Sequence, residues 1–429
     1  MISVLGLGFV GLTTALGFSE KGFKVYGFDV DSEKLNSIKN KKIPFYEEGL
    51  QEILEKNLNK NFVLTSSLAE SVKNSKVVFL CVGTPSDDKG KADLTYLLNA
   101  VDEILKNTEK GSKKLIITKS TIPPSTTKQH VIPFIESKGF KVGEDVFIAN
   151  NPEFLREGYA WSDFIEPDRV VAGAEDEYSR NLLQEIYAPF GAPIHFVSLN
   201  TGEFIKYLSN TLLSTLISYA NEMSMVAASI GEIDTKTAFN ILHEDKRWGD
   251  KKPCAMSKYA FPGCGFGGYC LPKDTQAMAY KAGEFGYNAK ILKDVLNVNN
   301  EIKPFWIEKI TKDLPKDTNI GVLGLSFKPN SDDIRQTPSK IILDMLLEKG
   351  YKNIYAYDPI ANELFDKVYN MPLRYENSVE NIAKNCDVIV IATAWQEFTE
   401  NQKYLEGKKV YDLRYVLDKK SKVPANTSC

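Results

Sequence analysis

The 429-residue sequence predicts an α/β protein in which two doubly wound parallel-sheet domains are joined by a helical domain with a long central helix. Three observations support this prediction. An apolar strand, a glycine-rich turn and a helix open the chain, the same pattern returns after residue 315, and a long segment of helical periodicity lies between the two copies. A chain of this length is too long for one hydrophobic core. We expect the domains to be 1–198, 199–305 and 306–429.

The overall charge argues against a partner chosen by bulk electrostatics. The formal net charge is -3 and no run of five or more basic residues occurs, so neither nucleic acid nor a membrane is an expected partner. The longest apolar stretches, at 76–83 and 387–394, are far shorter than the ~20 residues that cross a bilayer, and they predict buried strands. The opening "MISVLGLG" carries no export signal, so the cytoplasm is the expected location.

The cysteines and histidines form no metal or disulfide pattern. No CxxC pair or Cys/His cluster occurs, which argues against a disulfide framework and structural zinc, and we expect no metal. The three histidines fit no Ser/His/Asp arrangement. The six cysteines stand at positions 81, 254, 264, 270, 386 and 429.

The first 30 residues predict a Rossmann-like dinucleotide site. Gly6 makes a tight turn after a strand, Gly8 lets the backbone approach a pyrophosphate, and Gly11 allows the following helix to pack on the strand. Asp29 ends the next strand, where such folds place a carboxylate for the ribose hydroxyls. An acid there favours NAD over NADP, although Lys34 could offset part of the repulsion of a 2′-phosphate.

Three further strands are predicted in the first sheet, at 77–83, 115–119 and 146–150. Each runs into a polar loop, "GTPSDD", "KSTIPPST" or "NPEFLREG". In doubly wound sheets the ligands lie beyond the carboxyl ends of the strands, so we expect these loops to line the cofactor and substrate cleft.

The segment from about 201 to 230 predicts one long helix that joins the lobes and packs against a partner subunit. Lys206 and Asn210 are four residues apart and share a face of it. By itself such a pair is typical of a solvated stripe.

The opening pattern is repeated after residue 315. The repeating segments are 319–327, 353–360 and 386–395. Ser326 and Pro329 stand where the first copy has Gly8 and Gly11, so the second copy is not expected to hold a dinucleotide in the same manner. A different nucleotide is one interpretation, and a structural duplicate is the other.

The stretch "GFGGYCLPKD", at 265–274, predicts a presented nucleophile. Pro272 suits the first turn of a helix, which puts Cys270 just before the helix N-terminus, where the positive end of the helix and a nearby lysine favour a thiolate. By contrast, Cys81 and Cys386 lie in apolar segments, expected to be strands, and are interpreted as small hydrophobic residues.

A thiolate beside a hydride-accepting cofactor suggests a two-stage oxidation. Oxidising an alcohol to an aldehyde needs a base and NAD, whereas carrying the aldehyde on to an acid requires a new hydride donor. Addition of the thiolate gives a thiohemiacetal that yields a second hydride and leaves a thioester for water to cleave.

With these pieces assembled, the chain resembles the UDP-glucose/GDP-mannose dehydrogenase family over nearly its whole length. The motifs that carry the resemblance are "GLGFVG", "VGTP", "KSTIPP", "NPEFLREG", "EFIKYLSN", "GFGGYCLPKD" and "GLSFKPNSDDIRQTPS". The resemblance implies that a sugar C6 alcohol is oxidised to a carboxylate with two NAD⁺ and one water. It also implies a homodimer or higher homo-oligomer.

The resemblance assigns roles to individual residues. In catalysis, Cys270 is the nucleophile, Lys206 and Asn210 stabilise the oxyanion and hold water, and Asp274, Thr121 and Glu153 handle water, Glu153 as general base. The implied cofactor-binding residues are Gly6, Gly8, Val10, Gly11, Asp29, Lys34, Thr84, Thr121, Glu157 and Arg335. The implied substrate-binding residues are Glu153, Phe154, Leu155, Lys206, Asn210, Tyr259, Gly267, Phe327, Lys328 and Arg414, the last across a subunit interface.

Two departures from the family pattern bear on the substrate. The segment between Arg247 and Tyr259 is longer than usual, which affects the contact expected of Arg247, and Phe261 stands where animal enzymes carry a lysine. UDP-glucose is the favoured substrate, with GDP-mannose and UDP-N-acetylhexosamines as alternatives. The wider rivals are a two-electron hydroxy-acid dehydrogenase, which has no use for the cysteine, and a non-enzymatic NAD-binding regulator.

Overall fold

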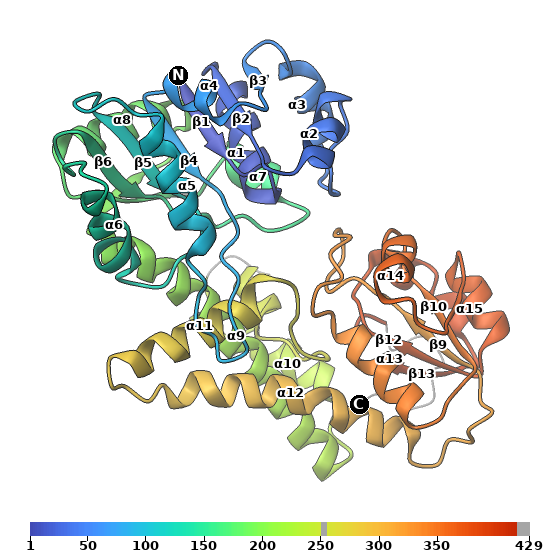
Figure 1. Ribbon diagram of the computed structural model, residues 1–429. Coiled ribbons are helices and arrows are strands. Elements are labelled where there is room, and N and C mark those ends of the chain that lie inside the picture. The colour runs from blue at the N-terminus through green and yellow to red at the C-terminus, as the bar shows by residue number, and fades with distance from the viewer. Residues whose placement is uncertain (250–254, 418–429) are drawn as a thin grey trace. The chain divides into compact units, whose positions relative to one another are not determined.

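A computed structural model describes residues 1–249 and 255–417, and the chain forms two compact units, 1–209 and 210–429 (Figure 1). The helix α9 (Leu199–Ile230) passes from the first unit into the second. The structure does not describe residues 250–254 and 418–429. Cys254, Cys429, part of the long segment after Arg247 and the end of the third predicted domain therefore lie outside the described residues.

The first unit is built on a sheet of eight strands in the order β3-β2-β1-β4-β5-β6-β7-β8. All neighbours are parallel except β6 and β7, which meet antiparallel at Asn150 and Gly173, so the predicted parallel sheet has one exception. The strands are β1 (Ile2–Leu5), β2 (Val25–Phe28), β3 (Phe62–Leu64), β4 (Val77–Leu80), β5 (Lys114–Thr118), β6 (Val146–Asn150), β7 (Val170–Gly173) and β8 (Ile194–Val197).

The helices of the first unit cover both faces of this sheet. Alternate residues of β4 pack into two separate cores, Val77 and Phe79 into one and Val78 and Leu80 into the other, as expected for a strand buried on both faces. The helices are α1 (Phe9–Glu20), α2 (Ser32–Lys39), α3 (Leu50–Asn57), α4 (Leu68–Lys73), α5 (Thr95–Lys106), α6 (Ile132–Ser137), α7 (Ala160–Ile165) and α8 (Glu177–Tyr187).

The second unit begins with a helical part. The remainder of α9 is followed by α10 (Thr235–Leu242), α11 (Cys270–Glu284) and α12 (Lys290–Thr311), and α11 and α12 lie side by side (Figure 1). Ser218 on α9 donates a buried hydrogen bond to the Val295 carbonyl on α12 at 2.8 Å. These helices support the loop that leads to Cys270.

The rest of the second unit is a smaller parallel sheet in the order β11-β10-β9-β12-β13. This order repeats that of the first five strands of the larger sheet, which agrees with the duplication expected from the sequence. Its strands are β9 (Ile320–Leu323), β10 (Ile354–Tyr357), β11 (Arg374–Tyr375), β12 (Val388–Ile391) and β13 (Lys409–Asp412), and its helices are α13 (Pro338–Glu348), α14 (Asn362–Tyr369), α15 (Val379–Asn385) and α16 (Gln396–Glu400).

Candidate active site

The first glycine turn has the shape that a dinucleotide pyrophosphate requires. Gly6 has φ +91°, and a Cβ added to Gly11 would lie 1.7 Å from the Gly6 carbonyl oxygen, so neither position accepts a side chain. Gly8 is different, because nothing lies within 4 Å of an added Cβ. Gly8 is also the N-cap of α1 and supplies no side-chain cap, which leaves the backbone N–H groups at that end for an anion.

Asp29 is held in place at the end of β2. Its Oδ2 accepts a hydrogen bond from the Leu7 N–H at 2.6 Å, and its Oδ1 accepts one from the Asp31 N–H at 2.9 Å. Lys34 Nζ lies 2.8 Å from Asp29 Oδ2, so the lysine forms an ion pair with this carboxylate. Part of the charge that was expected to repel a 2′-phosphate is therefore neutralised within the fold.

A hydrogen bond connects the loops that follow β4 and β5. Thr84 donates its hydroxyl hydrogen to the Thr121 carbonyl oxygen at 2.8 Å. The predicted Val10 lies in the first turn of α1, where its carbonyl accepts a hydrogen bond from Thr14, and Glu157 is half-buried in the loop after β6. These residues all follow the carboxyl ends of strands or begin the helix after β1, as predicted.

Glu153 and Lys206 form a buried ion pair in the first unit. Lys206 Nζ on α9 lies 3.0 Å from Glu153 Oε1, and the two residues are 4% and 8% exposed. The Leu155 N–H donates to the other carboxylate oxygen at 2.6 Å, and the Phe154 ring lies 5.6 Å from the Lys206 ammonium. The pair thus places a base and a cation within contact of each other.

A second buried lysine, Lys119, lies near this pair and was not singled out in the sequence. Lys119 is 4% exposed and donates to Asn151 Oδ1 at 2.8 Å. Burial lowers its pKa to about 8, an effect opposed by Cys81 and Glu153 and reinforced by Lys206. Its signal in the sequence is a lysine that directly continues an apolar strand.

Cys270 is the first residue of α11, so the prediction that it lies just before the helix is wrong by one position. Tyr269 is the N-cap, and Pro272 lies in the first turn as expected. The Cys270 side chain is exposed at the positive end of a 15-residue helix. The N-terminal position still favours a thiolate.

Asp274 is fixed by two partners one turn into α11. It is 1% exposed; Asn210 Nδ2 donates to its Oδ2 at 2.6 Å and Lys273 Nζ donates to its Oδ1 at 2.6 Å. Burial lowers the pKa of Lys273, but the Asp274 carboxylate and Cys270 outweigh this, and the net pKa is raised. Lys273 is therefore a cation beside the thiol, which the sequence indicated only as a nearby lysine.

The predicted residues of the 327–336 segment lie against Gly268 and Tyr269, the two residues that precede Cys270. The Arg335 guanidinium lies 4.8 Å and the Lys273 ammonium 5.4 Å from the Tyr269 ring centroid. Phe327 packs against Gly268, and Lys328 Nζ lies 5.4 Å from the Phe327 ring centroid. The cysteine thus follows an aromatic ring that two cations contact.

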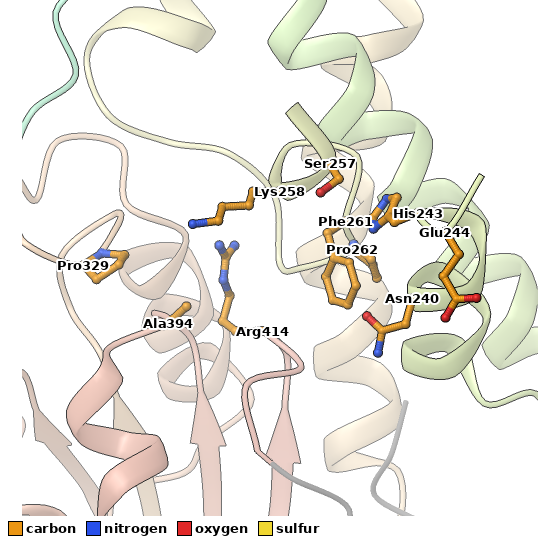
Figure 2. Close-up of a pocket in the computed structure, with 10 residues that line it drawn as sticks. All are labelled: Asn240, His243, Glu244, Ser257, Lys258, Phe261, Pro262, Pro329, Ala394 and Arg414. Atoms are coloured by element: carbon orange, nitrogen blue, oxygen red, sulfur yellow. The ribbon is translucent and has the colours of Figure 1, made fainter. Parts of the chain in front are cut away.

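A cavity of about 670 Å³ opens at the carboxyl ends of the second sheet (Figure 2). Pro329, Ala394 and Arg414 reach it from the loops after β9, β12 and β13. Figure 2 shows that the side chains of Lys258 and Arg414 both line this cavity. The remaining lining residues are Asn240, His243, Glu244, Ser257, Phe261 and Pro262. Two cations beside aromatic side chains are suited to a phosphorylated ligand with a planar group.

In the second glycine turn the carboxylate that corresponds to Asp29 is bound by neighbouring side chains. Asp358, the counterpart of Asp29, is 2% exposed, and its Oδ2 accepts hydrogen bonds from the N–H and hydroxyl of Ser326 and from Trp395 Nε1. A Cβ on Gly324 would lie 2.3 Å from the Thr393 Cβ. That this copy does not hold a dinucleotide in the same manner stays a prediction.

The other residues weighed in the sequence lie outside these contacts. Cys81 directly follows β4, and Cys386 lies between α15 and β12, so the expected place of each within a strand is wrong. Burial raises the pKa of both thiols to about 12. Arg247 is exposed and paired with Asp245 at 2.5 Å, and Tyr259 is half-buried after a short helix at Ala255–Lys258.

The described residues contain neither a metal-binding cluster nor a membrane-spanning helix. Within 1–249 and 255–417, no group of three or more His, Cys, Asp or Glu side chains is arranged to hold a metal ion. In the same parts of the chain, no helix combines the length and the apolar character needed to cross a membrane.

Three domain models of one family match the chain in order. They are the NAD binding domain of the UDP-glucose/GDP-mannose dehydrogenase family at residues 1–191, its central domain at 200–301 and its UDP binding domain at 321–419. Together they cover most of the sequence.

Individual proteins agree with the family models. The UDP-glucose 6-dehydrogenase YwqF of Bacillus subtilis is 34% identical over 427 residues, which is 97% of this chain and 94% of that protein. Among solved structures, a UDP-glucose dehydrogenase from Pyrobaculum islandicum aligns with a TM-score of 0.88 at 35% identity, over 98% of this chain and 95% of that one. A UDP-D-ManNAc dehydrogenase from Pyrococcus horikoshii aligns with a TM-score of 0.83 at 27% identity, over 97% and 96%.

Proposed function

The chain belongs to the UDP-glucose/GDP-mannose dehydrogenase family, and on this premise we propose that it oxidises UDP-glucose to UDP-glucuronate in a four-electron reaction. It is an NAD-dependent nucleotide-sugar dehydrogenase. The observation that carries the four-electron proposal is Cys270, exposed at the start of α11 beside Lys273 and within one turn of the fixed Asp274. A two-electron dehydrogenase has no use for such a thiol.

NAD⁺ fits the first unit and supplies the acceptor for one hydride in each oxidation. Gly8 leaves room for the pyrophosphate at the N-terminus of α1, and Asp29 offers carboxylate oxygens to the ribose hydroxyls. Thr84, Thr121, Glu157 and Arg335 remain predicted cofactor contacts.

In the proposed mechanism, Cys270 acts between the two oxidations. After the C6 alcohol has become an aldehyde, the thiolate adds to the aldehyde carbon and the carbonyl oxygen becomes an oxyanion that takes a proton. The resulting thiohemiacetal loses its C6 hydrogen as a hydride and its hydroxyl proton, which leaves a thioester. Water then attacks the thioester carbon, the carbon–sulfur bond breaks, and the carboxylate leaves as the thiolate is restored.

Two pairs of residues support these steps in the proposal. The Lys206 ammonium stabilises the oxyanion, and Glu153, in contact with it, accepts a proton from water. Asn210 and Asp274, hydrogen-bonded at 2.6 Å, orient the water.

We place the nucleotide of the substrate in the cavity of the second unit. Lys258 and Arg414 would hold the diphosphate, and Phe261 and His243 would lie along the base. In this proposal Arg414 contacts the substrate bound by its own chain. Its contact with a substrate across a subunit interface stays a prediction. The UDP binding domain model at 321–419 supports a uridine nucleotide, and the UDP-D-ManNAc dehydrogenase likeness keeps UDP-N-acetylhexosamines as the alternative beside GDP-mannose.

The decisive experiment is a panel of UDP- and GDP-sugars in which NADH is counted per sugar nucleotide consumed. We expect two NADH and one uronate from UDP-glucose, and slower turnover of the other sugars. One NADH per sugar with accumulating aldehyde would overturn the four-electron proposal. Absence of turnover with every sugar would favour a regulator.

A further inference from the structure

The turn that leads to Cys270, residues 265–269, is held by a side chain from α12, which follows it in the sequence. Asn299, on α12, accepts a hydrogen bond from the Phe266 N–H through Oδ1 at 2.7 Å and donates through Nδ2 to the Phe266 carbonyl at 3.1 Å. Asn299 and Phe266 are 6% and 5% exposed. The amide therefore satisfies both backbone groups of a buried loop residue, as a neighbouring strand would.

Lys303 lies one turn further along α12 and completes this contact. It is 2% exposed and donates to the Asn299 carbonyl oxygen. Gly265 has φ +98°, and a Cβ added there would lie 2.6 Å from Asn299 Oδ1 and 2.9 Å from Lys303 Nζ. The turn thus fits against the two side chains only because residue 265 is glycine.

The 327–336 segment holds the same turn from another side. The Gly268 N–H donates to the Arg335 carbonyl at 2.9 Å. A Cβ on Gly267 would lie 2.2 Å from the Gln336 carbonyl oxygen, and one on Gly268 would lie 2.9 Å from the Phe327 ring. Phe266, Gly267 and Gly268 are consequently fixed by partners on two separate elements, immediately before Tyr269 and Cys270.

We propose that Asn299 is a positioning residue for the Cys270 thiol. It acts through the turn: its amide fixes Phe266, and Phe266 sets where α11 begins and where the thiol is presented. The proposal deepens the function proposed above and rests on it only in giving Cys270 the role of nucleophile. Because a displacement of about 1 Å can cost about 100-fold in rate, a residue remote from the substrate can act this way.

The chemistry of the contact requires an amide. An aspartate at 299 could still accept from the Phe266 N–H, but it would leave the Phe266 carbonyl without a donor. Its charge would also attract the Lys303 ammonium. Asn299→Asp therefore breaks one half of the contact with almost no change in volume, and Asn299→Ser shortens the side chain so that both halves are lost.

The experiment compares these two variants with Ser218→Ala as the matched control. Ser218 on α9 makes a buried hydrogen bond to the Val295 carbonyl on α12, one turn before Asn299, and this bond does not involve the turn that leads to Cys270. Iodoacetamide labelling of Cys270, resolved by peptide mass spectrometry over a pH series, reports the thiol without any substrate. The kcat and KM for UDP-glucose, the NAD⁺ affinity and the melting temperature are measured on the same samples.

We expect Asn299→Asp to shift the pH of half-maximal labelling or to change the maximal labelling rate of Cys270 at least about threefold. The same variant should lower kcat about 10- to 100-fold, with KM changed less than about threefold. NAD⁺ affinity should stay at the wild-type value. Asn299→Ser should act in the same direction, and Ser218→Ala should lower only the melting temperature.

Two results would show that Asn299 has only a structural role. Either both Asn299 variants keep the wild-type labelling and kcat, or Ser218→Ala changes labelling and kcat as much as they do. If the Asp variant does not fold, the Ser variant decides. Failure of the proposed function looks different: the wild-type protein would oxidise no nucleotide sugar, while the labelling comparison would still test whether Asn299 positions the thiol.

Discussion

Asp29 makes two backbone hydrogen bonds and an ion pair within the fold. Such a carboxylate is pre-oriented for the ribose hydroxyls of NAD⁺, because its own loop fixes it. Lys34 has a double role: it neutralises Asp29 in the fold, and it would become available to a 2′-phosphate if the carboxylate were removed. Cofactor choice therefore depends on the pair.

We predict that Asp29→Ala weakens NAD⁺ binding about tenfold while NADP⁺ binding is unchanged or strengthened, since the variant loses the ribose acceptor and gains an unpaired lysine. Titration of both cofactors by calorimetry measures this. The double variant Asp29→Ala/Lys34→Met is the control and should bind both cofactors weakly. Equal losses for NAD⁺ and NADP⁺ in the single variant would undercut the ribose assignment.

Cys270→Ser tests the nucleophile directly. A hydroxyl is a far weaker nucleophile than a thiolate at neutral pH, so we predict loss of uronate formation by at least about 10³-fold with unchanged NAD⁺ affinity. Uronate is measured by chromatography and NAD⁺ binding by fluorescence. Cys386→Ala, which removes a buried thiol beyond α15, is the control and should retain turnover. Loss of NAD⁺ affinity in Cys270→Ser would make Cys270 a structural residue.

Single residues were predicted best where the backbone dictates their type. The glycines of the first turn follow local rules of turn geometry, whereas Cys270 was placed one residue too early relative to its helix. Lys119 and Lys258 could not be found this way, because whether a lysine is buried or faces a cavity depends on elements distant in the sequence. The assigned roles of the site residues stay predictions.

At the scale of elements, α9 carries an exposed apolar row. Phe204, Leu208 and Leu212 are four residues apart and 40%, 53% and 50% exposed, and Tyr219 is 54% exposed two turns later. Large apolar side chains at helical spacing on a surface indicate an interface. This row supports the proposal that the protein is a homodimer through α9.

The dimer proposal predicts that Leu208→Glu/Leu212→Glu lowers the sedimenting mass to that of one chain, because two buried carboxylates would face their symmetry mates. Sedimentation velocity measures this at micromolar concentration. Ile291→Glu, at a 68% exposed position of α12, is the control and should leave the assembly intact. Wild-type protein that sediments as a single chain would make the prediction wrong.

Elements with strong periodicity could be predicted: the 201–230 segment became α9, and the predicted apolar runs became strands. The short strands β3, β7, β8, β11 and β13 were not predicted, and other errors lie at boundaries. Cys270 joins α11 because Pro272 is tolerated anywhere in the first turn, so it does not fix the first residue. The antiparallel contact of β6 and β7 depends on how the chain returns to the sheet, which local pattern does not specify.

For the whole molecule, the predicted fold class is confirmed by the two sheets and the family models. One architecture occurs twice with different chemistry: Gly8 leaves the first turn open, whereas Ser326 and Trp395 occupy the carboxylate of the second. The substitutions were visible in the sequence, but the hydrogen bonds to this second carboxylate were not. The three-domain division at 198 and 305 stays a prediction.

Each compact unit also buries a lysine whose pKa is lowered to about 8. Burial lowers the pKa of Lys119 in the first unit and of Lys303 in the second to about 8. In the unfolded chain a lysine has a pKa of about 10.4. Between these values the unfolded state holds a proton that the folded state has released, so the free energy of unfolding rises with pH from about 8 to about 10.4.

We therefore predict that stability increases between pH 8 and pH 9.5, by about 2 kcal/mol for each lysine, and that Lys119→Met and Lys303→Met each remove one share of this increase. Below pH 8 both states hold the proton, so the difference between variant and wild type should be constant there. Urea unfolding at pH 7, 8 and 9.5 measures the slopes. Lys60→Met, at an exposed position, is the control for losing one charge. A wild-type slope in both buried-lysine variants would show that these ammonium groups keep their protons in the folded state.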